Sequence, residues 1–432
     1  MTTPIPKVGI VSLGCAKALV DSERILTRLR AEGYDISDSY DGADVVIVNT
    51  CGFLDSARAE SLEAIGEALA ENRKVIVTGC IGGDEAAFRA LHPSVLAVTG
   101  PHQYQAVVEA VHRVAPPQHD PKQSLVPPEG LHLTPHHYAY LKISEGCNNS
   151  CSFCIIPSRR GAEQSRPRVA ILEEVRRLAG HGVREVTLLG QIVDRYGFDL
   201  GGGYELADLL QDVARVEGLH RIRFLTSHPN YMSDRLLDTI ANDAKFCPFF
   251  ELPIQAGNDE VLERMRRGYT VQQFRDLVAR IRQRMPDAGI HTDVIVGFPG
   301  ETEAQFMDTF QVLEDLRLDV IHLAQYSERP GTFAALRLPD GVPAAEKQRR
   351  WVMIEAQGKR ILGEKHQTLL GQTVTVLIEG RDAKRDRWWG RTPQGKLVFF
   401  LDAQNRLGEI VEVELDWTGP FTMIGRQTGA PS

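Results

Sequence analysis

Three cysteines lie close together near the middle of the chain, with no fourth cysteine beside them. Cys147, Cys151 and Cys154 form the pattern C-x3-C-x2-C. A structural zinc site or an electron-transfer cluster normally closes its shell with four protein ligands. Three thiols in so tight a loop can hold a cubane [4Fe–4S] cluster and leave one iron open for a small molecule. The spacing therefore predicts chemistry at an open iron, and a partial zinc site completed by a distant histidine is the alternative.

A second set of three cysteines is spread over the first part of the chain. Cys15, Cys51 and Cys80 each come just after a predicted strand. Because the ends of parallel strands lie on one edge of a sheet, we expect these thiols to converge there. The sequence therefore predicts a second three-thiolate cluster with an open iron, the alternative being three buried free cysteines. Cys247 precedes Pro248, has no partner pattern and is interpreted as a packing residue.

The elements that must position the first set alternate between strands and helices. The β-branched run 44–49 is typical of a buried parallel strand. Helices are expected at 21–32, with Asp21 or Ser22 as N-cap, and at 57–72. Strands at 8–13 and 74–78 complete a small parallel α/β sheet domain over residues 1–125, and the Pro-rich stretch 116–128 is the candidate linker.

A longer βα series surrounds the tight cysteine loop and is assigned to residues 133–366. Amphipathic stretches such as 170–181 and 271–285 separate its strands. About six βα units indicate a (βα)6 partial TIM barrel, in which chemistry gathers at the carboxyl ends of the strands. The expected strands are 138–143, 185–189, 221–225, 249–254, 291–296 and 320–324.

The pattern changes again after a long helix expected at 344–368. Strands at 373–378, 397–400 and 409–415 alternate apolar and polar residues. They predict a small antiparallel β-barrel module over residues 367–432.

The bulk composition is that of an ordinary globular protein. The chain has 432 residues, 43% of them apolar and 25% charged, with a formal net charge of -8. This charge argues against general coating of nucleic acid but allows a local basic patch. No signal peptide and no apolar run of membrane-spanning length is seen, so a cytoplasmic location without membrane contact is expected. In a reducing cytoplasm, cysteines are more often metal ligands or reactive thiols than disulfides.

These motifs together resemble the radical S-adenosylmethionine (SAM) superfamily. The C-x3-C-x2-C loop with Phe153 before its last cysteine, at the first strand of a βα barrel, carries this resemblance. With the N-terminal three-cysteine domain and the C-terminal β-module, which resembles a TRAM domain, the chain is similar to the methylthiotransferases over nearly its whole length. The resemblance implies a 5′-deoxyadenosyl radical made from SAM at Cys147, Cys151 and Cys154. It also implies an auxiliary [4Fe–4S] cluster at Cys15, Cys51 and Cys80 that carries the sulfur to be inserted.

The resemblance also implies cofactor contacts at the strand ends. Gly190 and Gln191 occupy the place of the superfamily's turn that binds the SAM amino group, and Phe153 would lie near the adenine. Gln255 and Glu301, the latter in the turn 297–301, are further candidates, the alternative being polar ends of barrel strands. One SAM would supply the methyl group and a second the radical.

Two branches of the methylthiotransferase family compete for the substrate. One modifies the β-carbon of an aspartate in ribosomal protein uS12, and the other an isopentenyl- or threonylcarbamoyl-adenosine beside the tRNA anticodon. The segments 20–23, 49–61 and 151–161 resemble the uS12 branch, although Ala18 stands where both branches usually have Asn. The segments 226–229, 255–258, 326–332 and 390–392 resemble the tRNA branch.

Charge favours the uS12 branch. Residues 367–432 hold eight basic and eight acidic residues, whereas an RNA-binding module would be clearly basic. Residues 1–125 carry sixteen acidic and eleven basic residues, which suits a basic ribosomal protein. The stretch 384–391 interleaves basic residues with Trp and would suit RNA, or else be a hairpin with Trp in the core. We therefore expect the partner to be uS12 or the small ribosomal subunit, with the tRNA anticodon stem-loop as the alternative.

A hypothesis of another class is a non-catalytic iron–sulfur or sulfur carrier that docks through its β-module. The six-unit barrel with polar strand ends argues against it. For the enzyme, the resemblance implies a reductant such as flavodoxin or ferredoxin and a sulfur donor.

Overall fold

The computed structural model describes residues 5–37, 39–52, 55–72, 74–83, 88–89, 92–117 and 130–428. The chain divides into two compact units. The first comprises residues 1–134 together with 140–142 and 155–162, and the second comprises the remainder. The linker predicted at 116–128 lies outside the described residues from 118 onward, and the predicted domain limits stay predictions.

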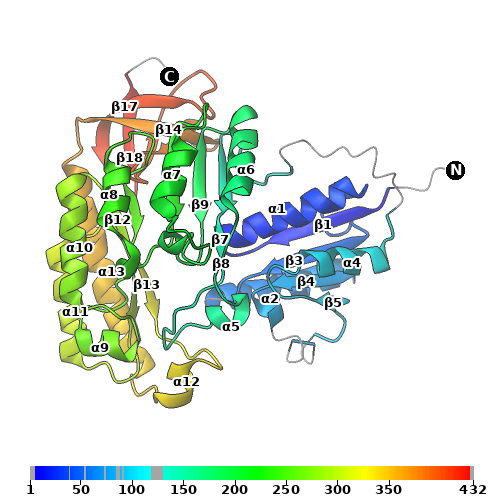
Figure 1. The fold of residues 1–432 in the computed structure, drawn as a ribbon, viewed down its shortest axis with the longest axis horizontal. Coiled ribbons are helices and arrows are strands. Elements are labelled where there is room, and N and C mark those ends of the chain that lie inside the picture. Colours follow the sequence, from blue (N-terminus) through cyan, green and yellow to red (C-terminus); the bar gives the residue numbers. More distant parts are fainter. Residues whose placement is uncertain are drawn as a thin grey trace. The chain divides into compact units, whose positions relative to one another are not determined.

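The first unit is built on a parallel sheet with the strand order β2-β1-β3-β4-β5. Its central strand β3 is buried along its whole length, as its β-branched composition predicts. Helices α1 and α4 share one core cluster with the sheet, and α2 shares the other, so the two faces are both covered (Figure 1). The elements are β1 (Lys7–Ser12), α1 (Ala16–Ala31), β2 (Asp35–Ser37), β3 (Val45–Thr50), α2 (Asp55–Glu71), β4 (Val75–Gly79), β5 (Ala97–Val98) and α4 (Tyr104–Val114).

The start of helix α1 differs from the sequence prediction. The helix begins at Ala16, directly after Cys15, which occupies the N-cap position. Asp21 and Ser22 are therefore buried inside the helix and cap nothing. Their polar groups are used elsewhere in the first unit, since Asp21 accepts from the Tyr104 hydroxyl at 2.5 Å and from Lys142.

Six parallel barrel strands form two sheets, ordered β10-β9-β6 and β11-β12-β13. They belong to the second unit except for residues 140–142 of β6, which are grouped with the first. A bridge between Ile222 and Phe246 and a hydrogen bond from Ser227 N–H to the Glu251 carbonyl (3.1 Å) join the two sheets. This confirms the partial barrel. The strands are β6 (Tyr138–Lys142), β9 (Glu185–Leu189), β10 (Arg221–Leu225), β11 (Phe249–Glu251), β12 (Gly289–Val296) and β13 (Val320–Gln325).

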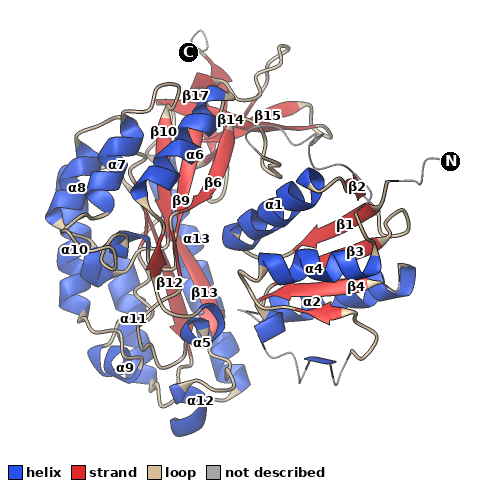
Figure 2. Cartoon of the chain, turned by 45° about the vertical axis from the view of Figure 1, so that its right-hand side comes forward, coloured by secondary structure: helices blue, strands red, loops and turns tan. Residues whose placement is uncertain are grey.

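Helices flank these strands, as Figure 2 shows. A short hairpin of β7 (Ser144–Glu145) and β8 (Gln164–Ser165) follows β6. In the described residues no helix is both long and apolar enough to cross a bilayer. The helices of the second unit are α6 (Arg168–Gly180), α7 (Leu206–Ala214), α8 (Asp234–Ala241), α9 (Asp259–Arg264), α10 (Val271–Arg284), α11 (Glu303–Leu316), α12 (Phe333–Arg337) and α13 (Ala344–Gln367). The helix α5 (Ile156–Arg160) is grouped with the first unit.

The second unit ends in a closed barrel of five strands, ordered β14-β15-β16-β18-β17. The sequence predicts three of them and misses two, β15 and β18. Trp388 on β15 is buried in the barrel core, and its indole N–H donates to the Asp402 carbonyl at 3.2 Å. The strands are β14 (Thr373–Asp382), β15 (Arg387–Arg391), β16 (Leu397–Phe400), β17 (Ile410–Thr418) and β18 (Met423–Gln427).

Candidate active site

The loop that carries Cys147, Cys151 and Cys154 follows β6 and is fixed by hydrogen bonds through Ser152. The Ser152 N–H donates to the Met265 carbonyl (3.0 Å) and its hydroxyl to the Arg264 carbonyl (2.7 Å). The Ser152 carbonyl accepts the Ala334 N–H at 2.7 Å. The loop therefore has a defined backbone that does not depend on the thiols themselves.

The three thiols of this loop are partly exposed and form no disulfide. Cys147 Sγ accepts the Asn149 N–H at 3.4 Å, and Cys151 Sγ accepts from the Arg267 guanidinium at 3.2 Å. Burial raises the pKa of the Cys147 thiol. The donor set is three soft sulfur atoms with hydrogen-bond donors aimed at two of them, which fits an iron–sulfur cluster better than a hard cation.

Buried polar atoms without hydrogen-bond partners collect at the carboxyl ends of the other barrel strands. In the described part of the chain five such side-chain atoms follow β9, β10, β11 and β13, and others lie elsewhere. Since buried polar atoms are normally hydrogen-bonded, such a group at one edge of a barrel fits a polar small-molecule ligand. The atoms are Gln191 Nε2, Ser227 Oγ, His228 Nε2, Gln255 Oε1 and Tyr326 OH.

The backbone at two of these strand ends restricts which residue can stand there. A Cβ at Gly190 would lie 2.5 Å from Ser144 Oγ, so only glycine fits beside the cysteine loop. Gln255 has a φ of 70°, a left-handed conformation that is uncommon for a residue other than glycine. Its N–H donates to the Asp293 carbonyl at 2.8 Å, which holds this backbone in place. Unusual backbone at a strand end is a mark of functional sites.

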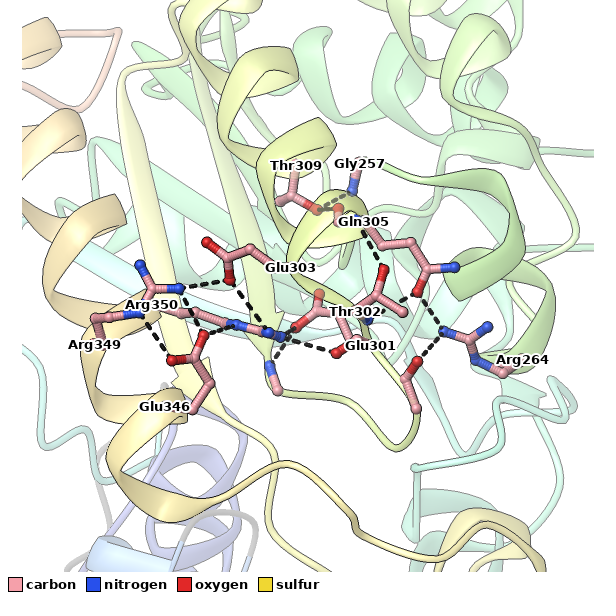
Figure 3. A network of polar contacts seen from close by, with 12 residues as sticks. Gly257, Arg264, Glu301, Thr302, Glu303, Gln305, Thr309, Glu346, Arg349 and Arg350 are labelled. Carbon is pink, nitrogen blue, oxygen red and sulfur yellow. Dashed lines mark hydrogen bonds and ion pairs between the residues drawn. The ribbon is translucent and has the colours of Figure 1, made fainter.

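The Glu301 carboxylate is bonded to other groups of the protein. It accepts the Gly297 N–H at 2.7 Å. It also accepts a hydrogen bond from the Arg350 guanidinium at 2.8 Å (Figure 3). The Arg350 side chain is 4% exposed and that of Glu301 is 1% exposed. The carboxylate thus closes the turn that follows β12, and this contact supports a positioning role for the turn.

Phe153 belongs to a row of aromatic rings at the ends of β12 and β13. Its ring packs edge-on against Phe298 with a centroid distance of 6.4 Å, and Phe298 packs against Tyr326 at 5.3 Å. An adenine ring is a suitable neighbour for such a row, because aromatic rings attract each other edge to face.

The thiols of the first unit lie at the ends of three adjacent strands. Cys15 follows β1, Cys51 follows β3 and Cys80 follows β4, and these strands are neighbours in the sheet. A Cβ at Gly14 would lie 2.7 Å from the Cys51 Cβ, and the Cys80 N–H donates to the Thr50 carbonyl at 3.1 Å. The strand ends that carry the three thiols therefore lie next to one another at one edge of the sheet.

Two features beside these thiols favour negative charge. Cys15 stands at the N-terminus of α1, where the helix dipole is positive. Arg160, which belongs to the first unit, lies with a guanidinium nitrogen 3.6 Å from Cys80 Sγ. Cys247, in contrast, is fully enclosed in the second unit at 3% exposure, as expected of a packing residue.

Sequence reasoning misses several residues of this site. Ser227, His228 and Tyr326 carry a detectable signal, because each is a polar residue just after a predicted barrel strand. Arg160 and Arg267 carry none, since each reaches its cysteine from a distant part of the sequence.

Comparison with family models agrees with this arrangement. Residues 141–313 match the model described as "Radical SAM superfamily", and residues 367–426 match the TRAM domain. Residues 7–100 match the model described as "Uncharacterized protein family UPF0004". Membership of the radical SAM superfamily implies a [4Fe–4S] cluster and SAM.

A solved structure supports the fold. TsrM from Kitasatospora setae, a radical SAM methyltransferase with cobalamin and a [4Fe–4S] cluster bound, superposes with a TM-score of 0.56 at 16% identity. The match covers 77% of each chain.

Curated relatives match over almost the whole chain. The ribosomal protein uS12 methylthiotransferase RimO of Paramagnetospirillum magneticum is 48% identical, covering 98% of this chain and 97% of that protein. The protein of the same name from Rhodospirillum rubrum is 44% identical over 99% of this chain and 100% of its own length. The chain therefore belongs to the RimO family of radical SAM methylthiotransferases.

Proposed function

We propose that this protein adds a methylthio group to the β-carbon of an aspartate in ribosomal protein uS12. The observation that carries the proposal is the presence of two three-cysteine sites in one chain of the RimO family. Cys15, Cys51 and Cys80 follow β1, β3 and β4, and the other three cysteines lie in the loop after β6 and β7. With three cysteine ligands, each site would leave one iron of a cubane cluster without a protein ligand. A non-catalytic carrier would have no use for the buried polar atoms at the ends of the barrel strands.

The residues divide between two clusters and SAM. Cys147, Cys151 and Cys154 hold the radical cluster, and Cys15, Cys51 and Cys80 hold the auxiliary cluster that presents the sulfur. When bound, the reduced radical cluster and SAM supply a 5′-deoxyadenosyl radical, and another SAM supplies the methyl group.

The barrel side chains orient SAM. Gln191 and Gln255 each offer a buried polar atom that has no protein partner within the described residues. Gly190 lets the backbone turn close to the cysteine loop. Glu301 keeps the turn at Gly297 closed, and the ring of Phe153 would lie near the adenine.

The charges of the C-terminal barrel favour uS12 over tRNA as the substrate. Arg387 lies 3.9 Å from the ring centroid of Phe399 and pairs with Asp382 at 3.4 Å. Other arginines of this barrel are likewise paired with carboxylates: Arg381 with Asp386, Arg391 with Glu379, Arg406 with Asp402 and Arg426 with Asp416. Arginines held by carboxylates are poorly placed to contact phosphates, which supply most of the affinity for RNA.

The tryptophans that could stack on bases are also engaged. Trp388 is 5% exposed and lies in the barrel core. The ring of Trp389 lies over Gly380, where a Cβ would be 2.8 Å from it. The stretch 384–391 is thus better explained as part of a barrel strand than as an RNA-stacking surface.

The reaction needs partners from outside the chain. Flavodoxin or ferredoxin is a suitable reductant for the radical cluster, and a sulfur donor must replace the sulfur that is consumed. A cytoplasmic location, where uS12 is made, follows from the proposal.

Serine variants of each cysteine set test the assignment. After anaerobic reconstitution, the triple variant Cys147→Ser, Cys151→Ser, Cys154→Ser should give no 5′-deoxyadenosine from SAM. The triple variant Cys15→Ser, Cys51→Ser, Cys80→Ser should still give it but leave uS12 unmodified. Each should contain about half of the parent's iron and sulfide.

Cys247→Ser is the matched control, since it removes a thiol assigned to neither cluster. It should retain the iron content, the formation of 5′-deoxyadenosine and the modification of uS12. The radical-enzyme assignment fails if the reduced parent protein with SAM yields no 5′-deoxyadenosine.

A further inference from the structure

A buried cation beside the radical cluster site has no part in the function proposed so far. Arg267 lies just after α9 and is 6% exposed. Its guanidinium donates to Cys151 Sγ at 3.2 Å. Among the described residues no carboxylate pairs with this arginine, so its positive charge faces the thiol without a bonded counter-ion.

Other contacts fix the guanidinium in this orientation. Its Nε donates to the Tyr269 hydroxyl at 3.1 Å, and its second terminal nitrogen donates to the Pro253 carbonyl at 3.3 Å. The Tyr269 hydroxyl lies 2.8 Å from the Pro253 carbonyl and 2.9 Å from the Ile254 carbonyl. Because each of the three guanidinium nitrogens donates a hydrogen bond, little freedom is lost when the group bonds the sulfur.

A purely structural role would be to tie the cysteine loop to the segment after β11. The bonds to Pro253 and Tyr269 would serve that role without any contact to sulfur. The contact to Cys151 adds a charged donor to a cluster ligand, and hydrogen bonds to the sulfurs are one of the factors that set iron–sulfur potentials.

We propose that Arg267 is a positioning residue that holds the Cys151 thiolate and raises the reduction potential of the radical cluster. The proposal rests on the proposed function, in which Cys147, Cys151 and Cys154 ligate that cluster. Reduction adds one negative charge to the cluster. A fixed cation in a site of low dielectric stabilises this reduced form more than the oxidised form.

The size of the effect follows from the type of bond. A hydrogen bond to a charged group contributes about 1.5 kcal/mol or more, which is about a tenfold change in an equilibrium constant. Loss of Arg267 should therefore lower the ratio of reduced to oxidised cluster about tenfold at a fixed potential. For a one-electron couple this is a midpoint about 59 mV more negative.

The measurement is an anaerobic redox titration followed by electron paramagnetic resonance. The parent is the full-length chain with Cys15, Cys51 and Cys80 changed to Ala, so that only the radical cluster titrates. In this background Arg267→Gln should lower the ratio of reduced to oxidised cluster about tenfold. Arg267→Lys keeps the charge and should lower this ratio less. Arg264→Gln is the matched control, because it removes an equal charge from a neighbouring arginine that contacts Gly300 and Gln305 and no cysteine.

Each outcome decides the proposal. It is overturned if Arg267→Gln holds as much iron as the parent and titrates at the same midpoint. It is also overturned if Arg264→Gln shifts the midpoint by as much as Arg267→Gln does. If Arg267→Gln takes up no iron, Arg267→Lys decides. The proposal is supported if Arg267→Lys takes up iron and its ratio of reduced to oxidised cluster, at a fixed potential, stays within about threefold of the parent's. If Arg267→Lys takes up no iron, the arginine has a structural role alone. If the parent itself holds no cluster, the cofactor assignment fails instead.

Discussion

The side chains that could do chemistry in this protein owe their positions to contacts that are remote in sequence. Cys51 lies beside Gly14, which is 37 positions earlier in the sequence, and Cys151 contacts Arg267, which is 116 positions later. The cysteines themselves could be found from the sequence, because their spacing and their places after strands are local properties. The arginines beside them could not, since no periodicity relates Arg267 to its thiol.

The pairing of Glu301 with Arg350 gives a prediction at the scale of single residues (Figure 3). Glu301→Gln removes the buried carboxylate that faces Arg350, which then keeps only its contacts with Glu346 and Glu303, so the free energy of unfolding should fall by about 2 kcal/mol. SAM affinity should weaken too, because the turn at Gly297 loses its carboxylate. Denaturant titration and equilibrium binding of SAM measure the two effects.

Glu303→Gln is the control for that variant. Glu303 pairs with Arg349 at 2.5 Å and reaches Arg350 only at 3.5 Å, and its side chain is 54% exposed. Its loss should change stability by less than about 1 kcal/mol. Equal effects of the two variants would contradict the account of the buried pair.

The elements that could be predicted are those with a strong local pattern. Strands β9, β10 and β16 have the same limits in the sequence prediction and in the structure. The short β2 and β5 were missed, because a strand of two or three residues exists only through pairing with its neighbours. The start of α1 was misplaced because Cys15 at the N-cap makes no side-chain cap bond, so the usual signal is absent.

Strand β15 supplies a prediction at the scale of elements. Its Gly390 lies so close to β14 that a Cβ would stand 2.0 Å from the Leu377 carbonyl oxygen. Gly390→Ala should therefore separate the two strands and destabilise the barrel by about 2 kcal/mol. Tryptophan fluorescence during denaturation can follow this, because all four tryptophans lie between residues 351 and 417.

Gly363→Ala is the matched control for the barrel variant. Gly363 lies inside α13, and its added Cβ would meet only Pro420 at 3.8 Å. Alanine favours a helix over glycine, so this variant should be as stable as the parent or more stable by about 1 kcal/mol. An unchanged midpoint for Gly390→Ala would show that the barrel tolerates the added methyl group.

At the scale of the second unit, one carboxylate joins three parts of the structure. Asp319, before β13, pairs with Lys365 of α13 at 2.6 Å and with Lys396 of the C-terminal barrel at 2.8 Å. It also accepts the Ile290 N–H at 3.0 Å. Burial alone would raise the pKa of Asp319, but Lys396 and Lys365 lower it from 3.8 to about 2.

This pairing predicts a pH dependence of stability. Because the folded pKa of Asp319 is lower than the unfolded value of 3.8, its contribution is complete above about pH 4 and is lost as pH falls through about 2. The difference corresponds to about 2 kcal/mol. Asp319→Asn should remove this part of the acid dependence in denaturant titrations between pH 5 and pH 2, and an acid profile identical to the parent's would contradict it.

The central claim concerns the whole molecule and its substrate. Mass spectrometry of uS12 and of tRNA nucleosides from a strain that lacks this chain tests it most directly. The account predicts that uS12 loses its methylthio mass, that the full chain restores it, and that the Cys15→Ser, Cys51→Ser, Cys80→Ser variant does not. An unchanged uS12 together with loss of the methylthio group from tRNA adenosine would contradict the account.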